Sequence, residues 1–575
     1  MTSQNGDYGS PQTSAISTAS IGNSKSGGQR VPPPETPEAI QTRFRVIAAF
    51  WAVIIFLGFP IWWKTTSIYR AHLPIQEMVD WADGKACRPV FPLEIHLATP
   101  AMPSPDSQHL LRTTQHALDD LNEFAAHHLR LKLTNDTSPS TSDQSESGTD
   151  SEGHGVVDGA DTALTVRVIA QEGLATPRSE LRADTTQLDI FYPPSQIPIP
   201  SSSNPPLSTF IAKELQRVYD EEKATIAHIL SGETTGSDSS QLMGSISRRL
   251  RRSMKYADTY HLSFSLFTPG SAPSSWDIEA AVQEYLAPLL DAFSPISNFT
   301  IDTQVQPYAT FSPMAPPIIY DDAEAAWTLK KEDLSAFINA AEWPLNPSIG
   351  NGPTLNFILY VPDPSQSPMV VKENRASSWI VPQWGGVFLL NPPLSQVDKN
   401  GNKVNPAHLS PESLQSAFMT FSHQLLTLLG TPTTPTSLPL RLQTLIRVRA
   451  AALLLSASST MGSLARLTES LPSIPIPATV ASSVSTTLSH LSSTCAHMRD
   501  GRFAAALASA RIAETEAERS FFEKSMVGQV YFPDEHKVAV YLPLLGPIGV
   551  PLVVSLVKEL KRLVAQWKAR RQPAA

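Results

Sequence analysis

The sequence predicts an α/β domain with a helical C-terminal portion, flanked by an N-terminal and a C-terminal transmembrane helix. Two apolar runs, Val46 to Trp63 and Val538 to Val557, stand near the two ends of the 575-residue chain. Between them, strand-like and helix-like segments alternate up to about residue 410, and only helical patterns follow. With 41% hydrophobic residues and a net charge of −9, the chain has the composition of a folded protein and no basic footprint for nucleic acid.

The first apolar run is long enough to cross a bilayer. Its eighteen residues contain no charged side chain, and at about 1.5 Å per residue they extend roughly 27 Å. Trp62 and Trp63 stand where an aromatic belt meets lipid headgroups. A buried core helix would carry a polar face, and a signal peptide would start near the first residue. We therefore expect a disordered cytoplasmic tail over residues 1–42 and an uncleaved transmembrane helix over residues 43–63.

The second apolar run, residues 538–557, is followed by a basic tail. Residues 558–575 hold six Lys and Arg against one acidic residue, Glu559. Because basic flanks stay in the cytoplasm, this tail and Arg43, which precedes the first run, place both termini there. We therefore expect residues 64 to about 537 to lie together on the other side, in a lumen or outside the cell.

Three prolines and two glycines mark the second predicted span. Pro543, Pro547 and Pro551 are four residues apart, so they lie on one helix face, and each removes a backbone hydrogen bond. Gly546 and Gly549 lie beside them and would allow another helix to approach closely. We interpret this face as a docking surface for other membrane subunits; a kinked, solitary helix is the alternative.

The region between the spans is predicted to be an α/β domain over 64–410 and a helical region over 411–537. Residues 134–161 hold seven acids and no Lys or Arg, so we expect a disordered loop there. Alternating or β-branched patterns predict strands at 90–98, 162–170, 259–267, 298–306, 355–362 and 385–391. Helical periodicity predicts helices at 109–131, 209–230, 276–293, 411–429, 438–470, 479–499 and 502–528.

No reactive centre can be recognised in the sequence. The serine-hydrolase elbow, the P-loop, the dinucleotide-binding glycine motif, the zinc-protease motif and CxxC pairs are all absent. We therefore predict no catalytic residue, no metal site and no cofactor. The chain has two cysteines, Cys87 and Cys495. In an oxidising compartment they could form one disulfide between the two juxtamembrane ends of the soluble region, or they could stay structural thiols.

Several polar clusters have both a functional and a structural interpretation. Paired aspartates can bind metals, but solvated surfaces explain them better, and the histidines lack a second ligand at metal-binding spacing. The segment RRLRRSMK, Arg248 to Lys255, could contact anionic headgroups or an acidic partner, or could be a solvated helix face. The aspartate pairs are Asp119-Asp120 and Asp321-Asp322, and the histidines, placed in helical patterns, are His127, His128 and His423.

Two N-glycosylation sequons fall in the segment expected across the membrane. They begin at Asn135, in Asn-Asp-Thr, and at Asn298, in Asn-Phe-Thr. Asn135 stands at the edge of the acidic loop and is expected to be the more accessible of the two.

Three stretches resemble a known family. PIWWKTTSIYRAHLPIQEM leads out of the first span at 60–78, VPQWGGVFLLNPP follows at 381–393, and FSHQLLTLLG at 421–430. Together they resemble the PIG-S family, a subunit of glycosylphosphatidylinositol (GPI) transamidase, over about residues 43 to 560.

This resemblance implies a role in the endoplasmic reticulum membrane. The complex removes a C-terminal signal from a precursor protein and joins the new carboxyl terminus to a GPI lipid, and a caspase-like subunit, PIG-K, does the chemistry. A member would be a non-catalytic scaffold, with PIG-K, PIG-T, PIG-U and a Gaa-type subunit as partners beside the bilayer, and GPI lipid or precursor as further contacts. Two other classes stay open: a luminal membrane-anchored transferase or hydrolase acting on glycolipid or glycoprotein, and an adhesion or receptor ectodomain.

The second of these stretches has two interpretations of its own. Gly385 and Gly386, after Trp384, could form a turn or bulge that presents the indole to a partner. Glycines beside a buried aromatic at the start of a strand are equally common as packing.

Overall fold

The chain divides into two units in the computed structural model. A terminal unit, Met1–Ile68 with Tyr531–Ala575, contains both ends of the chain, and a central unit spans Tyr69–Val530. The predicted acidic loop, apart from its two end residues, and the predicted N-terminal tail up to residue 35 lie outside the described residues. The structure describes residues 36–66, 69–134, 161–196, 205–231, 241–309, 318–334, 352–393, 396–397, 403–471, 474–527 and 534–571.

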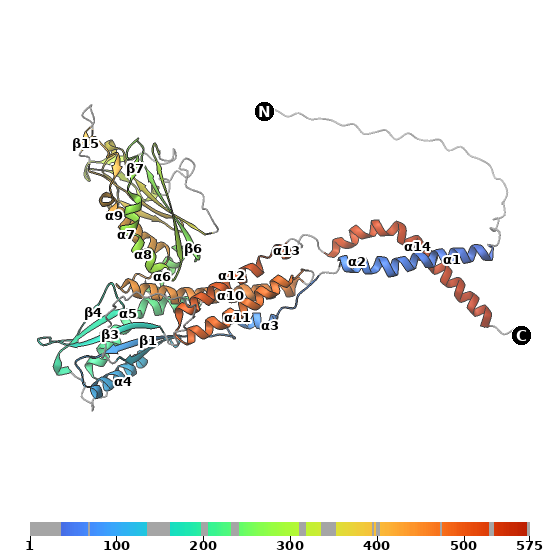
Figure 1. Ribbon diagram of the computed structural model, residues 1–575, viewed down its shortest axis with the longest axis horizontal. Helices are drawn as coiled ribbons and strands as arrows, with labels where there is room; N and C mark the ends of the chain where they lie inside the picture. The colour runs from blue at the N-terminus through green and yellow to red at the C-terminus, as the bar shows by residue number, and fades with distance from the viewer. Residues whose placement is uncertain are drawn as a thin grey trace, which may run out of the picture. The chain divides into compact units, whose positions relative to one another are not determined.

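The terminal unit consists of helices. Helix α1, Pro37–Val53, continues through a π-helical turn, Ile54–Gly58, into α2, Phe59–Thr66. The helix starts at Pro37, six residues before the expected start of the span, because proline is pre-organised for the first helical turn. Helix α14 runs over Asp534–Arg571, so the expected basic tail is helical up to its Arg571 (Figure 1).

The first sheet of the central unit has the strand order β2-β1-β3-β5-β4, parallel except for β4. Helix α4, Ser104–Asp120, packs on β2 and on α5, Pro206–Ser231. Its Thr113 hydroxyl lies 2.7 Å from the hydroxyl of Ser208 on α5. The strands are β1 Phe91–Ala98, β2 His127–Leu133, β3 Thr162–Ala170, β4 Arg178–Leu181 and β5 Gln187–Tyr192.

The second sheet has the order β13-β14-β11-β6-β8, parallel except for β13. Helix α9, Pro411–Leu428, buries Phe418 and Phe421 against Phe264 of β6 and Phe357 of β11. The strands of this sheet are β6 Thr259–Phe267, β8 Asn298–Gln306, β11 Thr354–Tyr360, β13 Ser378–Val381 and β14 Gly385–Leu389. Around it lie α7 Ile278–Tyr285, α8 Ala287–Phe293 and the small sheet of β9 Ile319–Asp321, β10 Ala326–Leu329 and β12 Met369–Val371.

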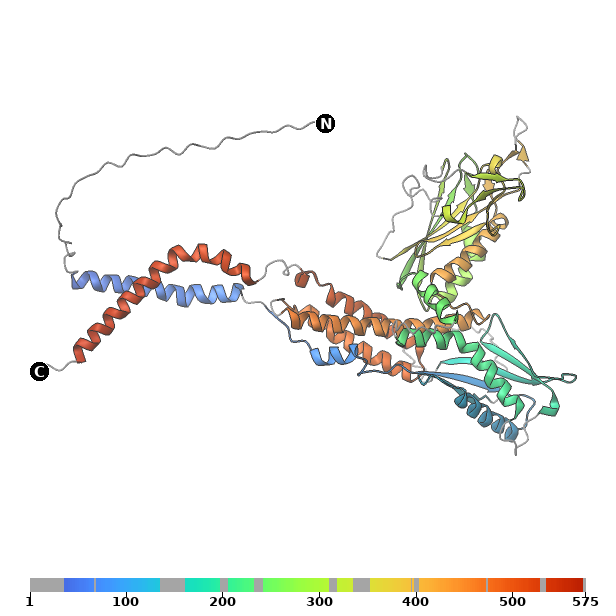
Figure 2. The same cartoon turned by 180° about the vertical axis from the view of Figure 1, so that it is seen from behind.

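Long helices complete the central unit and run beside the first sheet (Figure 1 and, from behind, Figure 2). Phe503 of α12 stacks on Phe91 of β1, and one hydrophobic core joins this sheet to the bundle. The helical region and the α/β region are therefore interleaved in space: α9 covers the second sheet, whereas the bundle covers the first. The bundle helices are α3 Ile75–Ala82, α10 Leu438–Ser470, α11 Ala478–Arg499 and α12 Phe503–Phe521, and the short α13 Lys524–Val527 follows α12. Helix α6, Gln241–Arg252, follows α5 in the chain and contacts it.

The predicted helix over 109–131 is wrong in its second half. Helix α4 ends at Asp120, and β2 begins at His127, so His127 and His128 lie on a strand. The alternating leucines at 129, 131 and 133 carry the period of two that marks a strand. The strands predicted at 162–170, 259–267 and 298–306 and the helix at 438–470 have the predicted bounds.

Candidate anchoring and docking site

The N-terminal helix presents apolar side chains on all sides. Within the described residues, Glu38–Lys64 is the one segment long and apolar enough to cross a membrane, and its most apolar window is entirely unburied. A large apolar surface is unfavourable in water and is normally covered by lipid or protein, so this surface fits a bilayer. The exposed side chains include Phe44, Val46, Phe50, Val53, Ile55, Phe56, Leu57, Phe59, Ile61, Trp62 and Trp63.

Helix α14 contains the predicted docking face. Pro543, Pro547 and Pro551 lie inside the helix and are exposed. Apart from the adjoining backbone of α14 itself, no atom of the described residues lies within 4 Å of a Cβ built on Gly546 or Gly549. Within the described residues, this proline and glycine face of α14 is therefore not covered. We predict that another membrane helix packs against it and that residues 538–557 cross the membrane.

An ion pair joins the two helices of the terminal unit. The Nε of Arg43 donates to Oε1 of Glu559 at 2.9 Å. Glu559 is only 7% exposed, although many large apolar side chains of the same helix are exposed. Arg43 precedes the first apolar run and Glu559 follows the second, so the contact brings together the two chain ends that the charge pattern assigns to one side of a membrane.

The first residues of the central unit, Tyr69 and Arg70, are hydrogen-bonded to the helical bundle. Arg70 forms a parallel bridge with Ile476, and the Ile476 amide donates to the Tyr69 carbonyl at 3.1 Å. The Arg70 guanidinium donates to the Thr468 carbonyl at 2.9 Å. Because the bonds reach both α10 and the link to α11, the chain leaving the first helix is fixed on the bundle.

Helix α3 packs on α10 at a glycine. A Cβ on Gly462 would lie 2.3 Å from the Cβ of Ala82, closer than two carbons can approach. Small side chains on both helices therefore allow this contact, and Met78 and Trp81 of α3 are buried.

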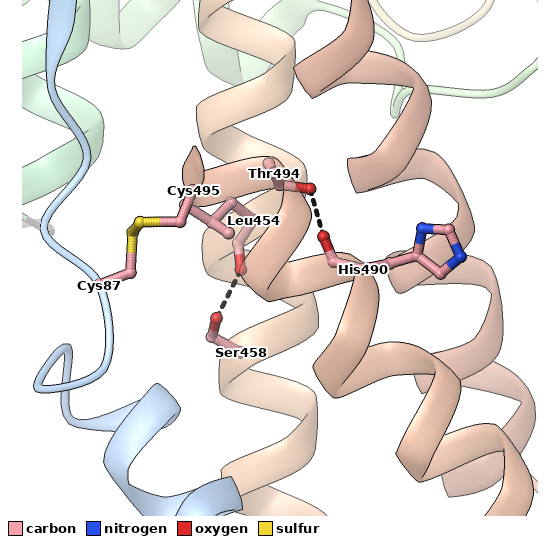
Figure 3. The surroundings of a disulfide bond; sticks show 6 residues. All are labelled: Cys87, Leu454, Ser458, His490, Thr494 and Cys495. Atoms are coloured by element: carbon pink, nitrogen blue, oxygen red, sulfur yellow. Dashed lines mark hydrogen bonds between the residues drawn. A yellow bond between two sulfur atoms is a disulfide. The ribbon is translucent and has the colours of Figure 1, made fainter. Parts of the chain in front are cut away.

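A disulfide also links the chain between Tyr69 and β1 to the helical bundle. Figure 3 shows Cys87, on the loop between α3 and β1, joined to Cys495 of α11 beside α10. The Cα atoms are 6.3 Å apart, within the usual range, and both residues are buried. The bond closes a loop across 408 residues of sequence. With both cysteines in this bond, the chain has no free thiol that could serve as a nucleophile.

A buried ionic clasp links β2, α5 and α10. The Arg447 guanidinium donates twice to the Glu222 carboxylate, each time at 2.6 Å, and His127 lies 3.4 Å from the same carboxylate. All three side chains are almost completely buried. Burial alone would raise the pKa of Glu222, but the Arg447 charge and the hydrogen bonds hold that pKa well below its usual range. The Glu222–Arg447 pair is balanced in charge and almost completely buried, which is typical of a structural ion pair.

The neighbouring Glu221 has different partners. It accepts hydrogen bonds from the amides and hydroxyls of Thr433 and Thr434, and its carboxylate contacts the Arg249 guanidinium. These contacts hold the loop before α10 against α5 and α6.

The other polar clusters of the sequence stay apart from one another. Asp119 and Asp120 end α4, Asp321 ends β9 with Asp322 in the turn after it, and His423 lies on α9. Within the described ranges, no group of three or more His, Cys, Asp or Glu is placed to hold a metal ion.

The glycines of the PQWGG stretch are packed. A Cβ on Gly385 would lie 1.8 Å from the Asn356 carbonyl oxygen, and one on Gly386 would lie 1.9 Å from Oε1 of Gln424. Trp384 is half-buried against the core between the second sheet and the small sheet. The structure therefore favours the packing interpretation.

One of the two sequons can be placed. Asn298 begins the edge strand β8 and is exposed, and its backbone amide donates to the Asp258 carbonyl at 2.8 Å. Asn135 lies outside the described residues, so glycan attachment at either position stays a prediction.

The residues of the clasp could not be found from the sequence. Glu222 and Arg447 are 225 positions apart, and no local sequence pattern predicts that they are in contact. A weak signal exists, since each is a charged residue within an otherwise apolar helical face.

Comparisons with known proteins agree with the resemblance. The family model described as "Phosphatidylinositol-glycan biosynthesis class S protein" matches residues 49–566. The GPI-anchor transamidase component PIGS of Bos taurus is 27% identical over 561 residues, and that of Homo sapiens is 26% identical, each alignment covering 91% of this chain and 96% of the relative. The GPI transamidase component PIG-S homolog of Schizosaccharomyces pombe is 26% identical over 93% of this chain and 87% of its own length. Because the family model covers most of the chain, this protein belongs to the phosphatidylinositol-glycan biosynthesis class S family, PIG-S.

Proposed function

We propose that this chain is a non-catalytic accessory subunit of GPI transamidase, a scaffold that supports the transfer of GPI anchors to precursor proteins at the endoplasmic reticulum membrane. The names of its relatives support the assignment to that complex. The observation that carries the scaffold role is a contrast within the chain: the central unit is internally tied, whereas the terminal helices leave apolar surface open.

In this proposal the chain crosses the membrane twice and has both termini in the cytoplasm. The first crossing is Glu38–Lys64 and the second lies within α14. The Arg43–Glu559 pair supports a common side for the two outer helix ends. The central unit then faces the lumen, where an oxidising environment suits the buried disulfide.

The partners follow from the same proposal. The caspase-like PIG-K supplies the reacting groups, and this chain holds PIG-K, PIG-T, PIG-U and the Gaa-type subunit in position around precursor and GPI lipid. Positioning of reactants raises a rate even when the positioning chain contributes no reacting group. The open proline and glycine seam of α14 is the surface we assign to the membrane subunits.

Purification in mild detergent tests the proposal. The tagged chain should bring down the caspase-like subunit in fixed stoichiometry. A Gly546→Leu substitution, which fills the open seam, should lower recovery of the membrane subunits and leave the central unit folded. Gly270→Leu, the same substitution at a glycine of the central unit with open space around it, is the matched control and should leave recovery unchanged. Catalytic turnover by the isolated chain, or its purification without partners, would contradict the scaffold role.

A further inference from the structure

A pocket lined by arginines lies beside the Glu221 contacts. It has a volume of about 330 Å³ and lies between α6, the end of α9, the start of α10 and strand β13. Three of the four arginines come from the RRLRRSMK segment. The pocket is lined by Ser245, Arg248, Arg249, Arg252, Ile380, Thr427, Leu428, Thr431, Thr433 and Arg441.

The charge in this pocket is not balanced. Among the residues that the structure describes, Glu221 is the carboxylate that contacts these guanidiniums, and it contacts Arg249. The Nε of Arg441 donates to a backbone carbonyl, that of Pro432, at 2.6 Å. Among the described residues, none of those that line the pocket is acidic. Burial, with the charge of Arg441 adding to it, lowers the pKa of Arg249 to about 10, so the group is still a cation at neutral pH.

Two buried polar atoms at the pocket have no hydrogen-bond partner in the described structure. They are Oγ1 of Thr431, a residue only 2% exposed, and Nε of Arg249. A buried donor without a partner costs free energy, and native proteins avoid it unless a ligand, ion or water satisfies the group.

We propose that this pocket binds the phosphate group of a phosphate ester. Guanidinium forks pair bidentately with phosphate oxygens, and a phosphate has enough oxygens to meet several arginines and the Thr431 hydroxyl at once. The volume lies at the lower end of the range for small-molecule sites, which suits a headgroup-sized ligand. Two sources share this chemistry: a free phosphomonoester and the phosphodiester headgroup of a lipid. The site adds a binding activity to an accessory subunit and does not depend on the partners assigned above.

Calorimetric titration of the purified full-length chain in a detergent of no net charge tests the proposal. The probes are phosphoethanolamine, a monoester, and glycerophosphoinositol, a lipid-like diester, each at constant ionic strength. Arg248→Gln and Arg441→Gln should each weaken binding by about tenfold or more, because each removes a charge-assisted contact. Arg251→Gln is the matched control: Arg251 lies on the same helix but does not line the pocket, so binding should change less than about twofold.

The possible outcomes distinguish the two ligand sources from each other and from a pocket that binds no phosphate ester. Tighter binding of the monoester assigns the site to a free phosphate ester, and tighter binding of the diester assigns it to a lipid headgroup; both support it. No heat of binding from either probe with the wild-type chain would overturn it, as would equal weakening by Arg251→Gln. If Arg441→Gln fails to fold, the exposed Arg248→Gln and the isosteric Thr431→Val, which should also weaken binding, still decide the question. Recovery of the partner subunits is measured separately, so a negative titration leaves the scaffold role untouched.

Discussion

The interactions that stabilise the central unit differ from those that stabilise the terminal unit. The central unit contains a disulfide across 408 residues, a fully buried ion pair and continuous apolar cores. In the terminal unit, the Arg43–Glu559 ion pair joins α1 and α14, the Arg43 side chain is 42% exposed, and many large apolar side chains of the described residues are exposed. A unit that satisfies its own surface can fold alone, whereas open apolar helices require lipid or other helices. The difference supports the proposal that the terminal unit anchors and assembles, whereas the central unit is stabilised by its own contacts.

Loss of the clasp should have the largest effect on the central unit. An Arg447→Met substitution leaves the Glu222 carboxylate buried without its cation, and such a loss typically costs about 3–5 kcal/mol in the free energy of unfolding. Chemical unfolding of the full-length chain in detergent, followed by Trp fluorescence, measures it. The double variant Glu222→Gln with Arg447→Met should recover much of the loss, because no unpaired charge remains; a loss below about 1 kcal/mol in the single variant would contradict the clasp.

The clasp also predicts a pH dependence. The pKa of Glu222 is lowered in the folded chain, so the pair contributes stability above the ordinary carboxyl pKa and loses it as the pH falls through the folded value. In Arg447→Met, burial instead raises the carboxyl pKa, and protonation removes the penalty. The stability difference between wild type and variant should therefore shrink from about pH 7.5 to about pH 5. A stability difference between wild type and Arg447→Met that stays constant over this pH range would contradict an ionic contribution of the pair.

Removal of the disulfide should have the next largest effect. Cys87→Ser should cost about 2–5 kcal/mol, the usual loss for a native disulfide, because the unfolded chain regains the freedom of a long loop. Cys495→Ser should cost the same, and the double variant no more than either. GPI attachment in cells should survive Cys87→Ser at normal protein level. Complete loss of attachment under that condition would assign the cysteine a chemical role.

The α3–α10 contact is expected to be sensitive to one carbon atom. Gly462→Ala places a Cβ 2.3 Å from that of Ala82, so the helices must separate, at about 1–3 kcal/mol. Gly173→Ala is no control, because its φ of +82° favours glycine, whereas Gly270→Ala meets open space and should be nearly neutral. Thermal unfolding compares them, and equal stability of the two variants would show that α3 does not pack closely here.

The smallest effect is expected in the terminal unit. Arg43→Gln removes an ion pair whose arginine side chain is 42% exposed, and ion pairs with a solvent-exposed partner contribute about 0–1 kcal/mol. The central unit should unfold as in the wild type. A loss of several kcal/mol in the free energy of unfolding of the central unit would contradict the view that this unit is stable independently of the terminal helices.

Local patterns predict the elements of this fold better than its long-range contacts. The strand TYHLSFSLF, with the bounds Thr259–Phe267, has its alternating apolar pattern within nine residues, and the turn residues Pro269 and Gly270 follow it. Strand β2 was missed because its leucines continue the apolar spacing of α4, and the break at Asp120 carries no proline or glycine. The assignment of α9 to one sheet and α10 to the other depends on surfaces that meet only in the folded chain.

The same distinction holds for the sites. The Cys87–Cys495 pair could be proposed because the chain has two cysteines, so one pairing was available. The arginine pocket combines α6 with Arg441, about 190 residues later, and the sequence could show only the basic segment. Glu222 and Arg447 had no signal strong enough to connect them.

The most direct test of the anchored scaffold is protease protection in sealed microsomes that carry the chain with a different epitope tag at each end. Protease added outside should remove both tags and leave one protected fragment that contains the central unit, until detergent opens the vesicles. Digestion of the central unit in intact vesicles, or protection of either tag, would contradict a chain held at both ends with its folded body across the membrane.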